Sequence, residues 1–303
     1  MTRIAIIGAG LCGLTAARAL QNEGLSPVVF DKGRGVGGRL STRRAENGLQ
    51  FDHGAQYLSA KDPSFAAFLA EAEAEGAATP WQVSDEAKTV GVPGMSGIAK
   101  FLAQGIDIRQ SVEIQSLQQD SAGWRIADEP FDRVISTVPA PQAIRLLSEA
   151  HPLRGAMSGV VMEPNLTLML ALPDTDPPFE TRRDPHDDVA WLALDSAKHD
   201  RAGPACWVAQ AGLAWSKAHL ELDKDEIAQK LLPLVCERLG ADPLDALYVS
   251  AHRWRYAQAS TPLGEPFLTD STLFVGGDWA ISNRAEGAWL SGSAMARALL
   301  ETL

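Results

Sequence analysis

The sequence predicts an α/β protein with two domains. Three observations lead to this fold class. The first forty residues run through an apolar stretch, a glycine turn, a helical pattern and a second apolar stretch; strand-like runs are grouped between residues 166 and 211; and a further apolar run and helix close the chain. With 303 residues, 46% of them hydrophobic, the chain is long enough for about two domains with a large core.

The N-terminal stretch predicts a βαβ unit. Residues 3–7 form an Ile-rich apolar run of the length of one buried strand, and residues 14–22 fit a helix that stops at Gly24. Residues 26–30 predict the second strand. A strand, a helix and a second strand in this order are typical of a parallel sheet.

The turn inside this unit carries a nucleotide-binding fingerprint. It reads Gly8-Ala9-Gly10-Leu11-Cys12-Gly13, and Asp31 follows the second strand, eighteen residues after Gly13. The glycines let backbone N–H groups approach a pyrophosphate at the N-terminus of the helix, where the helix dipole favours negative charge. We expect Asp31 to accept hydrogen bonds from ribose hydroxyls.

A second loop rich in glycine and arginine, residues 32–42, follows Asp31 directly. A dehydrogenase that binds only a nicotinamide cofactor does not need such a loop there. A ligand that is held along its whole length does need such a loop, so the loop predicts FAD. The alternative is a flexible surface loop.

Charge and cysteine content narrow the range of partners. The net charge of −11 disfavours nucleic acid or an anionic membrane, although an anionic small molecule needs only a local basic pocket. Cys12, Cys206 and Cys236 are widely spaced, which predicts a reduced, cytoplasmic protein without a structural zinc or another metal site. No apolar run reaches the ~18–20 residues of a membrane-spanning helix, and the apolar N-terminus lacks a clear signal-peptide cleavage site.

The rest of the chain predicts alternating helices and short strands. The predicted helices are residues 63–75, 95–104, 142–147, 223–239 and a last one from about Gly287 to 303. The predicted strands are residues 106–109, 112–118, 124–127, 131–137, 166–172, 189–194, 205–211 and 273–275, with a polar loop at 173–186.

Three further stretches carry candidate functional groups. Residues 49–60 place polar and aromatic groups beside Gly54 and suit a position close to a planar ring, although an ordinary strand and turn is the alternative. Residues 248–256 interleave aromatic and basic groups; the acidic chain makes a substrate-facing strand a better reading than nucleic-acid binding. Asp278 follows a strand and two glycines and suits a hydrogen bond to a ribityl or phosphate-bearing chain. A helix that begins near Gly287 would aim its N-terminus at the flavin N1–C2 carbonyl.

With these motifs placed, the chain resembles the FAD-dependent amine-oxidase-like flavoproteins and, among them, the bacterial renalases. The resemblance covers nearly the whole chain. Its general motifs are 8–13 with Asp31, 37–39 and 277–278, and its narrower ones are 52–57, 92–96, 137–141, 191–193, 252–254 and 286–292. It implies a p-hydroxybenzoate hydroxylase-like fold of two discontinuous domains. The FAD-binding domain would comprise residues 1–48, 95–148 and 258–303, and the β-sheet substrate domain residues 49–94 and 149–257.

The activity that the resemblance implies is oxidation of isomeric dihydro forms of NAD(P)H. A hydride passes to noncovalent FAD, and dioxygen is then reduced to hydrogen peroxide, with NAD(P)+ as the product. A dihydronicotinamide is already a hydride donor, so placing it matters most and no catalytic side chain is expected. One alternative is an FAD-dependent amine oxidase of unknown substrate, although the lysine that such enzymes often use near flavin N5 cannot be placed here. Another is a flavin-binding protein without turnover.

The resemblance also implies a set of site residues. Those expected to bind FAD are Gly8, Gly10, Leu11, Cys12, Gly13, Asp31, Lys32, Gly37, Gly38, Arg39, Gln56, Tyr57, Val112, Gly277, Asp278, Glu286, Gly287 and Ala288. Those expected to bind substrate are Tyr57, Ser59, Lys61, His252 and Trp289. For three of them a plain structural role is the alternative: Lys61 as a surface lysine, His252 as a core histidine, and Trp289 as a packing residue.

Overall fold

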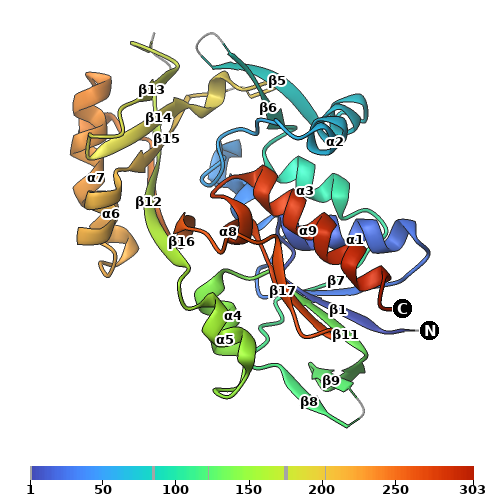
Figure 1. Ribbon diagram of the computed structural model, residues 1–303. Helices are drawn as coiled ribbons and strands as arrows, with labels where there is room; N and C mark the ends of the chain where they lie inside the picture. The colour runs from blue at the N-terminus through green and yellow to red at the C-terminus, as the bar shows by residue number, and fades with distance from the viewer. Residues whose placement is uncertain (1, 84–85, 122, 174–176, 202) are drawn as a thin grey trace.

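The two largest sheets of the protein, of six and five strands, are both packed against helices (Figure 1). The computed structural model describes residues 2–83, 86–121, 123–173, 177–201 and 203–303. The predicted βαβ unit is present as β1 (Ile4–Ile7), α1 (Leu11–Asn22) and β2 (Val28–Asp31). The helix begins at Leu11, earlier than predicted, because the last residues of the glycine turn already form its first turn.

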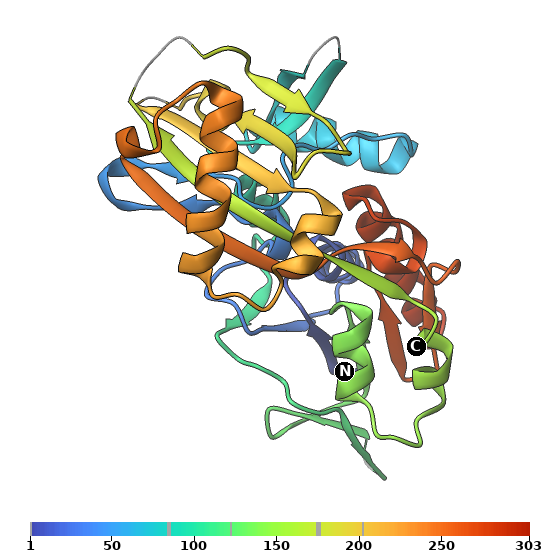
Figure 2. The same cartoon turned by 90° about the vertical axis from the view of Figure 1, so that its left-hand side faces the viewer.

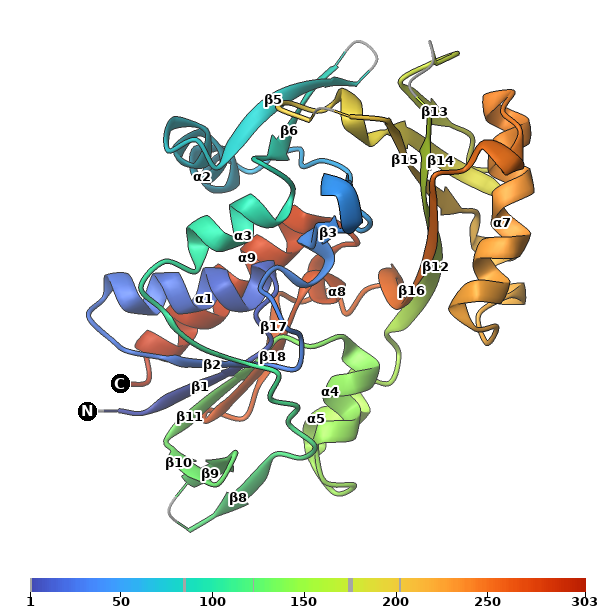
Figure 3. The same ribbon diagram turned by 180° about the vertical axis from the view of Figure 1, so that it is seen from behind.

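The first sheet has six strands in the order β17-β18-β11-β1-β2-β7. Its strands are parallel except for β17, which runs antiparallel to β18. The strands not yet given are β7 (Asp107–Gln110), β11 (Arg133–Ser136), β17 (Phe267–Thr269) and β18 (Leu273–Gly276). The beginning, middle and end of the chain therefore build one sheet, and the termini lie near each other (Figures 1 and 3).

Both faces of this sheet are buried. Ile4 and Ile6 pack on the side of α1, where α3 (Ser96–Leu102) and α9 (Ala285–Leu300) also lie. Ala5 and Ile7 pack on the opposite side. That side is covered by α4 (Ala140–Leu146), α5 (Pro152–Met157) and a small antiparallel sheet of β8 (Gln118–Asp120), β9 (Gly123–Ile126) and β10 (Glu129–Phe131). Burial on both sides explains why β1 is apolar without alternation.

The second sheet has the order β13-β14-β15-β12-β16 and is antiparallel. Its strands are β12 (Val161–Leu172), β13 (Thr181–Arg183), β14 (Val189–Leu194), β15 (Ala205–Ala211) and β16 (Tyr248–Thr261). One face is covered by α6 (Leu213–Ala218) and α7 (Lys224–Leu239) (Figure 2). The other face packs against β4 (Gln50–Phe51), which pairs with β3 (Arg43–Arg44).

Different parts of the segment that links the two sheets pack against different neighbours. Phe51 packs against the second sheet. By contrast, α2 (Pro63–Ala74) and the hairpin of β5 (Ala78–Val83) and β6 (Glu86–Gly91) share an apolar cluster with α1 and α3. The predicted domain boundaries, which place residues 49–94 wholly in the substrate domain, stay a prediction.

Two predicted elements are wrong. No strand covers residues 112–117, because the Val112 N–H bonds to the Asp31 carbonyl (3.0 Å) and the Leu117 N–H to the Leu146 carbonyl (2.8 Å), outside any ladder. The predicted loop 173–186 contains β13, which pairs with β14; its residues 174–176 lie outside the described part of the chain. Within the described ranges, no helix is long and apolar enough to cross a membrane.

Candidate active site

The carboxyl ends of the parallel strands meet at one edge of the first sheet. Gly8 follows β1, Asp31 ends β2, Thr137 follows β11 and Gly277 follows β18. Ligands of open α/β sheets bind outside this edge, where the order of the strands reverses, here between β2 and β11 on either side of β1. All three predicted glycine motifs therefore converge on one place.

The first glycine turn leaves a cradle at the start of α1. Gly8 has a φ of +109°, and a Cβ on Gly13 would lie 1.9 Å from the Gly8 carbonyl oxygen, so both positions require glycine. By contrast, apart from its chain neighbours and the adjoining helix backbone, no atom of the described residues lies within 4 Å of a Cβ built on Gly10. Because Gly10 has no capping side chain, the N–H groups of the first turn, from Leu11 onward, are left for a ligand. This arrangement fits a pyrophosphate.

Asp31 ties the two glycine loops together. One carboxylate oxygen accepts the Ala9 N–H and the other the Gly33 N–H, both at 2.6 Å. A carboxylate can accept about four hydrogen bonds, so the predicted bonds to a ribose have room. The structure brings Val112 to the Asp31 carbonyl, and it places the Lys32 ammonium 3.9 Å from the Glu113 carboxylate.

The second glycine loop packs directly on the first. The Gly37 N–H bonds to the Ala9 carbonyl (2.8 Å), and Gly37 has a φ of +110°. A Cβ on Gly38 would lie 3.4 Å from the Gly10 Cα. The loop is therefore fixed to the pyrophosphate cradle.

Arg39 at the end of this loop reaches the C-terminal part of the chain. Its guanidinium forms two hydrogen bonds with the Asp278 carboxylate, at 2.6 and 2.7 Å. Asp278 is the first residue of α8 (Asp278–Ile281), directly after Gly277. The Arg39 carbonyl accepts the Ala55 N–H (2.8 Å), and a Cβ on Gly54 would lie 2.1 Å from that oxygen. Arg39 thus joins the predicted FAD segments at 37–39, 54–57 and 277–278.

The first turn of α9 meets the segment before α2. The Glu286 carboxylate accepts the N–H groups of Lys61 (2.6 Å) and Asp62 (2.7 Å). Gly287 and Ala288 are buried, and a Cβ on Gly287 would lie 2.5 Å from the Ser282 hydroxyl. Two predicted site segments, 57–61 and 286–289, are therefore neighbours.

The predicted aromatic residues have different partners. The Tyr57 ring lies edge-on to Trp191 at 5.9 Å, and the Lys88 ammonium lies 5.7 Å from its centre. Trp289 stacks on Phe68 at 4.4 Å, with its indole N–H bonded to Ser64 (3.2 Å). Within the described ranges, no ring contact joins Tyr57 to Trp289. The places predicted for both beside the flat ring of the substrate, and for Tyr57 also at FAD, stay predictions. Ser59 and Lys61 are exposed.

His252 belongs to a cluster with His53 and Trp254. The two imidazole rings lie 4.7 Å apart, and the Trp254 ring lies 4.2 Å from His252. The indole N–H of Trp254 bonds to the His53 carbonyl (2.8 Å). Burial, with the positive charge of Arg43 next in size, lowers the pKa of His53 to about 4. Burial and the neighbouring His53 lower the pKa of His252 to about 3. Both imidazoles are therefore neutral at pH 7.

His53 is a functional candidate that the sequence prediction did not select. The sequence could have pointed to His53, since it lies in the motif 52–57. The buried Nδ1 atoms of His53 and His252, Oε1 of Gln56 and Nε1 of Trp191 make no hydrogen bond among the described residues. Buried polar atoms of this kind are costly to leave unpaired, so they fit a site that receives a polar ligand.

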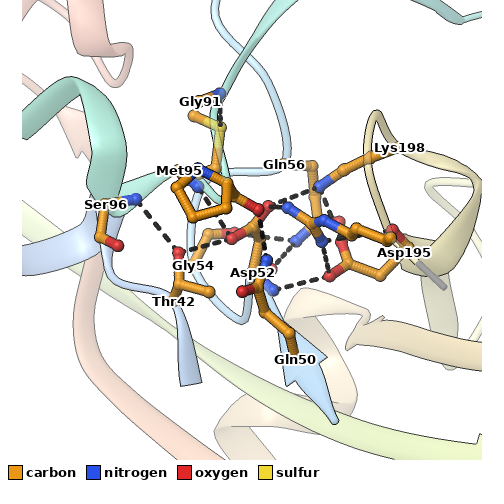
Figure 4. Close-up of polar contacts among 12 residues, drawn as sticks. Thr42, Gln50, Asp52, Gly54, Gln56, Gly91, Met95, Ser96, Asp195 and Lys198 are labelled. Atoms are coloured by element: carbon orange, nitrogen blue, oxygen red, sulfur yellow. Dashed lines mark hydrogen bonds and ion pairs between the residues drawn. The ribbon is translucent and has the colours of Figure 1, made fainter. Parts of the chain in front are cut away.

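The structure also shows a buried ion quartet that the sequence did not reveal: Asp52, Asp195, Lys198 and Arg201 (Figure 4). The Lys198 ammonium lies 2.7 Å from Asp195 and 3.2 Å from Asp52, and Arg201 pairs with both carboxylates. All four side chains are at most 6% exposed.

The quartet fixes the segment that leads to Gln56 and Tyr57. Burial alone would raise the pKa of Asp52, but the charges of Lys198 and Arg201 outweigh it and lower that pKa. Burial raises the pKa of Asp195. Asp52 also accepts hydrogen bonds from the Thr42 hydroxyl (2.7 Å) and the Met95 N–H (2.9 Å). Asp52 thus connects the residue before β3, the start of α3 and the ion quartet next to the second sheet.

The chain matches two family models in sequence. Residues 6–72 match an NAD(P)-binding Rossmann-like domain, and residues 73–300 match the flavin containing amine oxidoreductases. The chain is 24% identical to renalase from Mus musculus over 301 residues, which cover 88% of this chain and 87% of the mouse protein. It is 39% identical over 67 residues to protoporphyrinogen oxidase 2 of Arabidopsis thaliana, which is 22% of this chain and 13% of that protein.

The fold is shared with solved amine oxidases. Putrescine oxidase bound to putrescine superposes with a TM-score of 0.73 at 14% identity, and cyclohexylamine oxidase from Brevibacterium oxydans IH-35A with a TM-score of 0.73 at 13% identity. Each superposition covers 99% of both chains. The glycine cradle fits the FAD that this family carries. The chain belongs to the flavin-containing amine oxidoreductases and is an FAD-dependent oxidoreductase.

Proposed function

We propose that this protein oxidises isomeric dihydro forms of NAD(P)H to NAD(P)+, with dioxygen as the final acceptor and hydrogen peroxide as the second product. The observation that carries the proposal is the extent of the match to mouse renalase, which takes in 88% of this chain and 87% of the relative. The match to the plant protoporphyrinogen oxidase covers only 22% of this chain. A likeness over 88% of the chain extends well beyond the nucleotide fingerprint and takes in most of the second sheet.

The residues that would hold FAD lie along one path across the carboxyl edge of the first sheet. The N–H groups of Leu11 and Cys12 would meet its pyrophosphate, Asp31 its ribose, and Asp278 its ribityl or phosphate-bearing chain. When bound, FAD supplies a two-electron acceptor for a hydride. We propose that it binds without a covalent bond, since burial raises the pKa of the Cys12 thiol to about 12 and keeps it protonated.

The charge state of the His53 and His252 imidazoles suits the binding of a nicotinamide ring. Loss of a hydride from a dihydronicotinamide creates a positively charged ring, and a protonated histidine next to it would oppose that charge. Both imidazoles are neutral at pH 7, because their pKa values are lowered to about 4 and about 3. A neutral imidazole can still donate or accept a hydrogen bond, so we propose that His252 binds the carboxamide.

The other predicted substrate residues extend this assignment. We propose that Tyr57 and Trp289 lie beside the flat nicotinamide ring of the substrate, and that Ser59 and Lys61 meet its ribose or phosphates. The contact between Glu286 and the backbone of Lys61 supports the second part, since it holds the exposed 59–61 segment next to α9. We also propose that the two domains are arranged as in p-hydroxybenzoate hydroxylase.

The proposal is tested by anaerobic stopped-flow mixing of the purified yellow protein with borohydride-treated NAD+ or NADP+, which contains the dihydro isomers. We expect the flavin absorbance to bleach within seconds and to return when oxygen is admitted, with equal amounts of NAD(P)+ and hydrogen peroxide. Ordinary NADH, reduced at the usual ring carbon, is the matched control. Absence of bleaching by the isomer mixture would refute the proposal.

A second candidate is an amine oxidase. It is favoured by the shared fold with putrescine oxidase and cyclohexylamine oxidase over 99% of the chain. Under this alternative, putrescine or cyclohexylamine bleaches the flavin and the dinucleotide isomers do not. Indifference to both groups of compounds would favour a flavin-binding protein without turnover.

A further inference from the structure

The charges of two basic side chains, Arg43 and Lys224, act on both histidines of the cluster. Arg43 comes from β3 and Lys224 is the first residue of α7. Neither side chain makes an ion pair or a hydrogen bond with any residue that the structure describes.

Arg43 reaches this place through the pairing of β3 with β4. It lies opposite Phe51 in that ladder, and the Phe51 ring stacks on Tyr248 at 5.3 Å. Tyr248 and His252 are four residues apart in β16, so their side chains share one face of the second sheet. His53, two residues after Phe51, contacts His252 on that face.

Lys224 reaches the same strand from the opposite face of the sheet. The Arg253 guanidinium donates hydrogen bonds to the carbonyls of Leu220 (2.7 Å) and Leu222 (3.2 Å), which fixes the segment before α7 to β16. Among the strands that the structure describes, β16 pairs with β12 alone and forms the edge of the sheet. The two cations therefore flank an open edge strand.

Three of the acidic groups near Lys224 have other partners. Asp223 caps α7 by accepting the N–H groups of Asp225 and Glu226, and Glu226 accepts the Asp223 N–H in return. Glu221 pairs with Arg255 at 2.7 and 2.9 Å. After burial and His53, the charges of Lys224 and Arg43 are the next causes of the lowered pKa of His252. Both cations thus act on the imidazole assigned to the substrate ring.

We propose that Arg43 and Lys224 bind the pyrophosphate of the dinucleotide substrate while its nicotinamide ring lies at His53 and His252. This inference rests on the proposed function and deepens it, because it makes a nucleotide diphosphate the recognised class of substrate. A guanidinium forks onto two phosphate oxygens and an ammonium adds a point charge. The FAD pyrophosphate has its own cradle at Gly10, so the two diphosphates do not compete.

The test compares Arg43→Gln and Lys224→Gln with two matched controls, Arg44→Gln and Lys230→Gln. Arg44 is the exposed neighbour of Arg43 in β3, and Lys230 is an exposed lysine later in α7. Binding of NAD+ is followed by tryptophan fluorescence or by perturbation of the flavin spectrum, which requires no turnover. We expect each site variant to weaken NAD+ binding about tenfold, as lost charge-assisted hydrogen bonds do, and the controls to bind like wild type.

A second readout separates phosphate recognition from a general disturbance. With borohydride-treated NAD+, the variants should raise KM about tenfold and leave kcat unchanged. With borohydride-treated nicotinamide riboside, which has no phosphate, wild type and variants should share one KM. Circular dichroism and FAD content verify that each variant is folded and loaded.

The outcomes distinguish this inference from the proposed function. If wild type binds NAD+ and is reduced by the isomers while both site variants behave like the controls, the phosphates lie elsewhere and only this inference fails. If the variants affect the riboside as strongly as the dinucleotide, the cations do not recognise phosphate. If wild type neither binds NAD+ nor is reduced, the proposed function fails and this inference fails with it.

Discussion

The Arg39 guanidinium and the Asp278 carboxylate, 239 residues apart in the chain, face each other through two hydrogen bonds of 2.6 and 2.7 Å. Asp278 is 5% exposed, and Arg39 also donates to the Ala257 carbonyl at 2.6 Å. The pair joins the second glycine loop to the start of α8. Because both segments are expected to contact FAD, the pair fixes the width of the cofactor site.

We predict that Arg39→Lys weakens FAD binding at least tenfold, because a lysine cannot form the paired hydrogen bonds that a guanidinium makes. Arg39→Ala should in addition lower the free energy of unfolding by about 3–5 kcal/mol, since it leaves a buried carboxylate unpaired. Titration of the apoprotein with FAD and thermal denaturation measure the two effects. Arg34→Lys, at an exposed position of the same loop, is the control. Equal FAD affinity of both variants would contradict the prediction.

The glycine cradle gives a second prediction. Gly13→Ala should yield colourless protein, because its Cβ would lie 1.9 Å from the Gly8 carbonyl oxygen and must displace the turn. Gly155→Ala is the matched control: this glycine lies in α5 with no atom within 4 Å of the added Cβ, so alanine should be neutral or slightly stabilising there. The ratio of flavin to protein absorbance after purification is the measurement. A yellow Gly13→Ala protein with normal FAD content would show that the turn tolerates a side chain.

Local spacing made the nucleotide-binding unit predictable. The strand, the glycine turn, the helix and Asp31 lie within about thirty residues, and each of their signals depends on near neighbours. The same reasoning failed at residues 112–117. There, valine and isoleucine alternate with polar residues as in a strand, but the backbone hydrogen bonds go to Asp31 and Leu146 instead of a neighbouring strand.

Contacts between distant segments could not be predicted in the same way. Asp52 meets Lys198 and Arg201 across about 150 residues, and a single charged residue in a sequence is normally a surface residue. His53 and Trp254 are 201 residues apart and depend on the packing of β4 against the second sheet. Their chemistry is visible in the sequence, whereas their proximity is a property of the fold.

The ion quartet gives a third prediction. Asp52→Asn should lower the free energy of unfolding by about 3–5 kcal/mol, because it leaves Lys198 and Arg201 facing one carboxylate in a buried site. The double variant Asp52→Asn/Lys198→Met removes one charge of each sign. It should be less destabilised than the sum of the two single variants, since the remaining Asp195 and Arg201 still pair.

Urea denaturation of the four proteins of this cycle measures the coupling between Asp52 and Lys198. Glu86→Gln is the control, because its ion pair with Lys88 lies at the surface, where such pairs contribute little. Strict additivity of the two single variants would mean that the buried charges act independently.

The histidine cluster gives a fourth prediction, on the pH dependence of stability. The pKa of His53 is lowered to about 4 and that of His252 to about 3, whereas an unfolded chain titrates its histidines near the ordinary value of 6.5. Between these values the unfolded state binds more protons, so stability is fully present above about pH 6.5 and is lost as the pH falls toward 4. Each histidine contributes a slope of about 1 kcal/mol per pH unit.

Replacing His252 with Gln should remove one of the two slopes. Urea denaturation at pH 4.5, 5.5 and 6.5, roughly the interval between the folded and unfolded pKa values, measures this change. His199→Gln serves as the control because its side chain is 55% exposed, and it should leave the wild-type slope in place. An unchanged slope in His252→Gln would mean that His252 is protonated in the folded protein, and the neutral imidazole assigned to the carboxamide would have to be given up.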